Sequence, residues 1–114
     1  MPLCQIITNI RPMNSKALSI KVSSTVAELL SKPLSYVMAM VTYNSSLTFG
    51  GTDEPAAYVQ IGSIGSVGGN SNINIVTGIT NLVAAELDVE ASRIYVAIQD
   101  IDGAEFALNG STFA

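Results

Sequence analysis

Four segments of this 114-residue chain carry short, nearly continuous runs of apolar residues between polar, turn-forming ones. The segments cover residues 3–8, 37–43, 58–64 and 94–99. Each run is too short for a helix of normal length and contains β-branched or aromatic residues, which favour extended structure. The four segments are therefore predicted to be strands.

Two longer segments place apolar residues three or four positions apart, which is the spacing of one face of a helix. The first begins at Asn14 or Ser15 and is stopped by Lys32-Pro33. Its apolar face is formed by Leu18, Val22, Val26, Leu29 and Leu30. The second covers residues 71–87. Its apolar face is formed by Ile75, Ile79, Leu82, Val83 and Leu87.

The elements follow the order strand, helix, strand twice, with equivalent elements about 56 residues apart. A helical connection makes the two strands of each unit parallel. We therefore expect an α+β fold in which two βαβ units form a four-stranded mixed sheet with two helices on one face. A single domain over residues 1–114 is expected, with a structural repeat of about 1–50 and 56–114 and a glycine-containing loop at 44–55.

The predicted strands are apolar at successive positions, as in Val37–Val41 and Tyr95–Ile98, instead of alternating with charged residues. Such strands are typical of sheets that are covered on both faces. Two helices cover only one face, so we expect another subunit to cover the other. The tail, residues 106–114, is long enough to add a short strand to a neighbouring subunit.

Composition excludes several classes of function. The net charge is −4 and the five basic residues are spread along the chain, so nucleic acid is not an expected partner. No apolar run reaches the roughly 20 residues of a membrane-spanning helix, and no secretory signal is recognised, so we expect no membrane association and a cytoplasmic location. With no histidine and one cysteine, Cys4, the usual zinc sites, histidine-dependent triads and an intrachain disulfide are excluded.

The second residue offers a candidate base. Removal of Met1, which is common before a small residue, turns Pro2 into an N-terminal secondary amine. An α-amino group titrates at about 7.7 to 8.0, and an apolar environment disfavours its charged form, so part of the amine is neutral near pH 7. General base catalysis needs a group of this kind. The alternative is that Pro2 only begins an edge strand, where a missing N–H does no harm.

Other candidate residues have ordinary structural explanations as well. The glycine-rich segment 62–69 lacks the motifs of a P-loop or a dinucleotide site, although N–H groups near a helix start bind carboxylates and oxyanions. Lys32 follows a predicted helix end, where a cation is favourable. Tyr36 and Tyr95 are typical core or interface aromatics. Nothing close to Cys4 in the sequence lowers its pKa, so it is expected to be a small core residue.

Several short motifs run from one end of the chain to the other. They are the Met1-Pro2 start, Thr8-Asn9, Lys32-Pro33 before Tyr36, Phe49-Gly50-Gly51 with Glu54-Pro55, Ser63-Ile64-Gly65 with Gly68-Gly69, Arg93-Ile94-Tyr95, and Asn109 with Ser111-Thr112-Phe113-Ala114. In this order and spacing the chain resembles the macrophage migration inhibitory factor family of the tautomerase superfamily.

The resemblance implies a homotrimer whose three sheets line a central channel, with active sites at the subunit boundaries. It also implies that Pro2, once Met1 is removed, is the catalytic base. Lys32 and the backbone N–H of Ile64 are then expected to bind the keto acid end of the substrate, and Tyr95 is expected to come from the adjacent subunit. The residues expected to form an apolar wall around the substrate ring are Tyr36, Tyr95 and Phe106.

Three departures from the family pattern bear on specificity. Ala56-Ala57-Tyr58-Val59 stands where many animal members have a C-x-x-C motif, which excludes thiol–disulfide chemistry by that motif. Ala97 stands where those members often have an asparagine that binds a phenolic hydroxyl, and Leu108 where a tryptophan is common. Hydroxylated substrates such as 4-hydroxyphenylpyruvate or dopachrome methyl ester are therefore expected to bind less well than phenylpyruvate.

The leading hypothesis is a cofactor-independent, metal-free keto–enol tautomerase that acts on phenylpyruvate-like α-keto acids, with weaker dopachrome isomerase activity. A second hypothesis is a cytokine-like signalling protein, secreted without a signal peptide, that binds a receptor and in which the pocket is secondary. A third is a structural trimer without catalytic activity.

Overall fold

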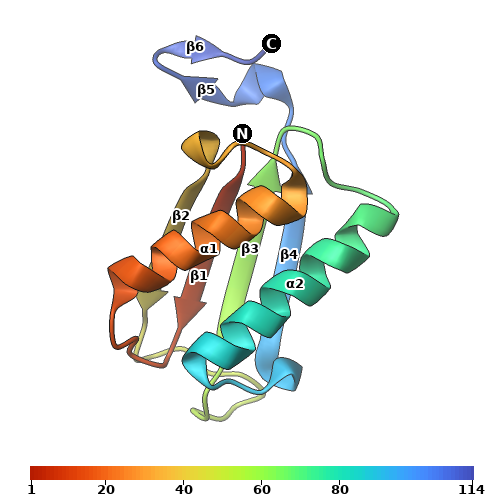
Figure 1. Cartoon of the computed structure of the whole chain (residues 1–114). Coiled ribbons are helices and arrows are strands. Elements are labelled where there is room, and N and C mark those ends of the chain that lie inside the picture. The colour runs from red at the N-terminus through yellow and green to blue at the C-terminus, as the bar shows by residue number, and fades with distance from the viewer.

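The computed structural model describes all residues from Met1 to Ala114. Two helices lie across one face of a four-stranded sheet, and a small hairpin formed by the tail stands at one end (Figure 1). The strands of the sheet are β1 (Leu3–Thr8), β2 (Met38–Tyr43), β3 (Ala57–Ser63) and β4 (Ile94–Asp100). The helices are α1 (Ser15–Leu30) and α2 (Asn70–Leu87). The tail hairpin consists of β5 (Ala107–Leu108) and β6 (Ser111–Thr112). Three single turns of 3-10 helix are η1 (Leu34–Tyr36), η2 (Ala91–Arg93) and η3 (Gly103–Glu105).

The sheet has the strand order β2-β1-β3-β4. β1 is parallel to β2, β3 is parallel to β4, and the two units meet through the antiparallel pair β1 and β3. This arrangement confirms the expected α+β fold of two βαβ units with both helices on one face. The bounds of the four predicted strands differ from the observed ones by at most one residue.

The ends of α1 are set by local hydrogen bonds. The side chain of Asn14 accepts a bond from Ala17 N at 3.0 Å, which satisfies one of the free N–H groups of the first turn. At the other end, Ser31 adopts a left-handed conformation with φ of 53°, and Lys32 N donates to Ala27 O at 2.9 Å. The helix therefore ends before Pro33, and its last residues turn the chain back toward the start of β2.

The core lies between the helices and the sheet. Alternate residues of β1 and β3 are fully buried there, and the central ones are Cys4, Ile6, Val59 and Ile61. They pack with the predicted apolar faces of both helices in one hydrophobic cluster. The helices approach each other closely at Gly78, where a Cβ atom would lie 2.7 Å from a methyl carbon of Leu29. A larger residue at this position would require the side chain of Leu29 to move.

The open face of the sheet is less apolar than the continuous strand sequences suggested. Because side chains alternate between faces, Gln5 and Gln60 point away from the helices, and the two residues are paired at the centre of the sheet. Large apolar side chains are exposed on the same face, including Met38 and Tyr95. No helix of the structure has the length and apolar character needed to span a lipid bilayer.

Candidate active site

A cavity of about 290 Å³ lies at the N-terminal end of the chain. All of its lining residues except Ser35 are apolar, and they come from the chain start, η1, the start of β2 and the tail. They are Met1, Leu3, Ser35, Tyr36, Val37, Met38, Phe106, Ala107, Leu108 and Phe113. We call this cavity the N-terminal pocket. It brings two predicted wall residues, Tyr36 and Phe106, to the end of the chain that carries Pro2.

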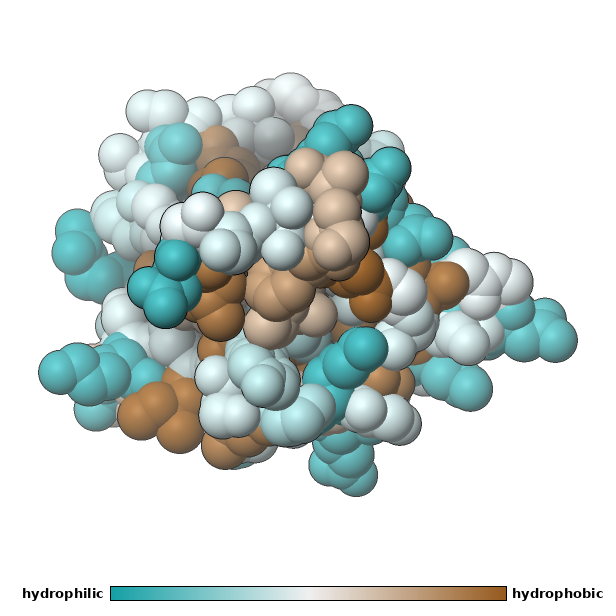
Figure 2. All heavy atoms as spheres, turned by 90° about the horizontal axis from the view of Figure 1, so that it is seen from above, coloured by the Kyte–Doolittle hydropathy of each residue, from teal (hydrophilic) through white to brown (hydrophobic).

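The tail closes one side of the N-terminal pocket. Phe113 N donates to Gly103 O at 2.9 Å and to Phe106 O at 3.0 Å, and the rings of Phe106 and Phe113 are stacked with centroids 6.2 Å apart. A Cβ atom at Gly103 would lie 2.8 Å from Phe113 O, so this close return of the chain requires glycine. Within the chain the tail forms the hairpin of β5 and β6, and its expected pairing with a neighbouring subunit stays a prediction. Viewed from above, this end of the molecule shows apolar side chains between polar ones (Figure 2).

Pro2 is fully buried at the start of β1, and its carbonyl accepts a hydrogen bond from Met38 N at 3.1 Å. Burial, and secondly the positive charge of Lys32, lower the pKa of the Met1 α-amino group. With Met1 attached, the nitrogen of Pro2 is an amide and has no basic lone pair. Removal of Met1 would make the buried nitrogen of Pro2 the terminal amine, and burial disfavours the charged form of an amine.

Ile64 lies at the same end of the sheet as Pro2. Leu3 pairs with Gly62 across the antiparallel β1 and β3, so the residues after Gly62 run beside the chain start. The segment after Ser63 is held to β4, because Ile101 N donates to Ser63 O at 2.8 Å and Gly65 N donates to Asp100 Oδ1 at 3.1 Å. Pro2 and Ile64 thus lie at one end of the sheet, and Lys32 is close enough to the chain start to influence the terminal amine.

Tyr95 lies at the opposite end of the sheet. Tyr95 pairs with Tyr58, and Tyr58 pairs with Ile7 of β1. Ile7 lies five residues after Pro2, so Tyr95 is roughly 16 Å from Pro2 along the strand direction. Its side chain is 67% exposed on the open face. Tyr95 therefore does not reach the N-terminal pocket of its own chain. It lines a second cavity of about 420 Å³ instead, together with Phe49.

Thr8 and Asn9 belong to a motif for which the sequence suggested no role, and the structure supplies one. Thr8 Oγ1 donates to Ala56 O at 2.8 Å, and the Asn9 side chain bonds four backbone groups of the loop between β2 and β3. The two residues thereby fasten the loop that carries Phe49. Sequence reasoning also missed Met1, Leu3 and Phe113 as pocket residues, since they come together only when the tail folds back.

The remaining chemistry of the chain is limited. No group of three or more cysteine, aspartate or glutamate side chains is close enough to hold a metal ion. Cys4 is fully buried in the core, and burial raises the pKa of its thiol to about 12. The thiol is therefore neutral and shielded from substrates, as expected of a small core residue.

Comparison with known proteins gives matches over the whole chain. The family model described as macrophage migration inhibitory factor matches residues 1–114. A macrophage migration inhibitory factor homolog from Brugia malayi is 40% identical over 115 residues, which cover 99% of both chains. The factor from Mus musculus is 30% identical over 115 residues, covering all of both chains. The crystal structure of a homologue from Prochlorococcus marinus superimposes with a TM-score of 0.93 at 32% identity, over 98% of this chain and 99% of that one.

Proposed function

The chain belongs to the macrophage migration inhibitory factor family, and we propose that it is a cofactor-independent keto–enol tautomerase of phenylpyruvate-like α-keto acids. The observation that carries this proposal is the apolar N-terminal pocket around a buried chain start, where burial and Lys32 lower the pKa of the terminal amine. A neutral amine in an apolar pocket is suited to removing a proton from a carbon atom next to a ketone.

In the proposed reaction the nitrogen of Pro2 takes a proton from that carbon atom. The electron pair of the broken C–H bond forms the double bond of the enol, and negative charge moves to the keto oxygen. Lys32 pairs with the substrate carboxylate, and the N–H of Ile64 donates to the oxygen on which charge develops. Transfer of the proton from the Pro2 nitrogen to this oxygen completes the enol and regenerates the neutral amine, and the same steps in reverse return the ketone.

The aromatic ring of the substrate would lie in the N-terminal pocket against Tyr36 and Phe106. We propose that the protein acts as a homotrimer, in which an adjacent copy adds Tyr95 to this wall. The location of Tyr95 supports this arrangement, because the side chain is exposed and too far from the pocket of its own chain. The exposed apolar residues of the open sheet face are also suited to contact with a second copy.

The decisive experiment compares the natural protein without Met1 with its Pro2→Gly variant. Enol absorbance measures phenylpyruvate turnover, and intact mass establishes that Met1 is absent. We expect the variant to lose activity by orders of magnitude while its circular dichroism and molecular mass in solution stay unchanged. Equal activity of the two proteins would refute Pro2 as the base.

A protein that retains Met1 provides the matched control, since its Pro2 nitrogen is an amide. This preparation should be folded and inactive. Activity of the Met1-containing protein would contradict the mechanism even if the Pro2→Gly variant were inactive.

The names of the relatives support a second candidate, a cytokine-like protein that binds a receptor. Their similarity covers the whole chain and is not confined to the pocket residues. Receptor binding that survives the Pro2→Gly substitution would support this role, and absence of binding would exclude it.

A further inference from the structure

The guanidinium group of Arg93 connects a loop to an aromatic ring. Arg93 is the last residue of η2, directly before β4. Its Nε donates to Pro55 O at 2.9 Å, and a terminal nitrogen donates to Glu54 O at 3.1 Å. Its central carbon lies 5.1 Å from the centroid of the Phe49 ring. The side chain of Arg93 therefore contacts the loop between β2 and β3 at two places, its last residues and the ring of Phe49 near its middle.

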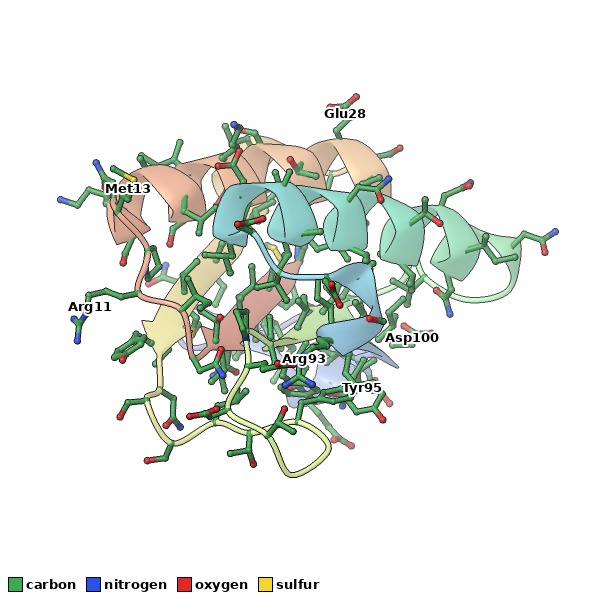
Figure 3. The ribbon with its side chains drawn as sticks, turned by 90° about the horizontal axis from the view of Figure 1, so that it is seen from below. Arg11, Met13, Glu28, Arg93, Tyr95 and Asp100 are labelled. Atoms are coloured by element: carbon green, nitrogen blue, oxygen red, sulfur yellow. The ribbon has the colours of Figure 1, made fainter.

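Phe49 in turn contacts Tyr95. The ring centroids are 4.9 Å apart and the planes are inclined by 38°. We call Phe49 and Tyr95 the aromatic pair. Figure 3 shows Arg93 and Tyr95 near the loop after β2, whereas Arg11 projects away on another side of the molecule. Since Tyr95 is 67% exposed, burial in its own chain does little to fix its ring, and the contact with Phe49 restricts it.

The side chain of Asn9 holds the backbone of this loop, but backbone bonds alone do not orient the ring of Phe49. Gly50 and Gly51 follow it with positive φ values of 61° and 79°, a conformation that costs glycine little. One isolated bridge, between Phe49 and Thr52, is the local backbone pairing. The side-chain contacts that bear on the orientation of the Phe49 ring are those with Arg93 and Tyr95.

We propose that Arg93 is a positioning residue that orients the aromatic pair and thereby determines affinity for substrates with an aromatic ring. This inference rests on the proposed function, in which the pair completes the pocket of a neighbouring copy. Arginine is needed because its planar fork bonds two carbonyl groups while one face covers a ring. Lysine keeps the charge but has no such plane. Pro2 and Lys32 act on the other end of the substrate, so the proton transfer itself does not depend on Arg93.

The test measures kcat and KM of the protein without Met1 for phenylpyruvate and for an aliphatic α-keto acid, α-ketoisocaproate. For Arg93→Lys we expect KM for phenylpyruvate to rise about five- to tenfold, because aromatic contacts of this kind are modest in strength. Its kcat, and both constants for the aliphatic substrate, should be unchanged. Phe49→Leu removes the ring while leaving the Arg93 hydrogen bonds in place, and should show the same selective loss. The double variant should be no worse than either single one.

Arg11→Lys is the matched control. The Arg11 guanidinium lies 4.3 Å over the ring of Tyr43, which is the same kind of contact at a place away from the aromatic pair. This variant should behave like the natural protein with both substrates. Equal losses for both substrates in Arg93→Lys, a fall in kcat, or no change at all would overturn the proposal.

A second measurement does not require activity. In the NMR spectrum of tyrosine-labelled protein, the ring of Phe49 should displace the ring resonances of Tyr95, and Arg93→Lys should abolish this displacement while Arg11→Lys retains it. If no substrate is turned over by the natural protein, the proposed function fails, but the NMR result still decides whether Arg93 orients the pair. Unchanged Tyr95 resonances in Arg93→Lys would refute that role.

Discussion

Replacing Asn9 with alanine should destabilise the protein far more than an ordinary surface substitution does. Asn9 follows β1, and its side chain holds the loop between β2 and β3. Nδ2 donates to Glu54 O at 2.9 Å, with longer contacts to Leu47 O at 3.2 Å and Asp53 O at 3.3 Å. Oδ1 accepts from Ala56 N at 3.0 Å. The substitution removes all of these bonds at once.

The size of the effect follows from which partners are left without a bond. Ala56 is 0% exposed, so water does not reach its N–H, and an unpaired buried group costs about 1–3 kcal/mol. The carbonyl oxygen of Glu54 is exposed and keeps its bond from Arg93, so the lost bond from Asn9 adds only about 0.5–1 kcal/mol. We therefore expect Asn9→Ala to lower the free energy of unfolding by about 2–4 kcal/mol.

Urea denaturation followed by circular dichroism measures this difference. Asn14→Ala provides a matched control, because it removes one exposed cap bond to Ala17 N and should cost only about 1 kcal/mol. If Asn9→Ala is no more destabilising than Asn14→Ala, the inference that Asn9 satisfies a buried N–H is wrong.

Three further predictions concern titratable and polar groups. Lys32→Gln removes a positive charge that lowers the pKa of the terminal amine, so the pKa of the Pro2 amine should rise. The base works in its neutral form, so activity falls as the pH is lowered through this pKa. In the variant this fall should occur at a higher pH than in the natural protein, and an unchanged pH–rate profile would contradict the prediction. Ser63→Ala should leave the free energy of unfolding unchanged or increase it, since Ser63 Oγ is buried without a hydrogen-bond partner, and a loss above about 1 kcal/mol in urea would show that the hydroxyl is bonded. Cys4, with its thiol pKa raised to about 12 by burial, should react with a thiol reagent only in denaturant, and rapid labelling of the native protein would argue against this.

Most of the fold was predictable because its determinants are local. The spacing of Leu18, Val22 and Val26 makes one face of α1 apolar, and the same residues are buried against the sheet. The run at residues 3–8 was predicted as a strand with its observed bounds. Parallel pairing then followed, because a helical connection brings the next strand back in the same direction.

The candidate site was predictable only in part. Pro2 was a candidate base from the chain start alone, whereas the substrate-binding roles of Lys32 and Ile64 came from resemblance, and the three residues lie toward the same end of the sheet. The spacing of residues did not indicate the role of Phe113, because the tail reaches the N-terminal pocket only by folding back at Gly103.

By itself, the sequence determined the helices, the strands and the apolar face of each helix, since these depend on neighbours a few positions away. Only the tertiary structure decided that Gln5 and Gln60 meet on the open face, that Tyr95 lies at the end of the sheet away from Pro2, and that Arg93 reaches Phe49. These arrangements involve residues about 40 or more positions apart in the sequence. They depend on the strand register and on the path of the loop, which no local pattern specifies.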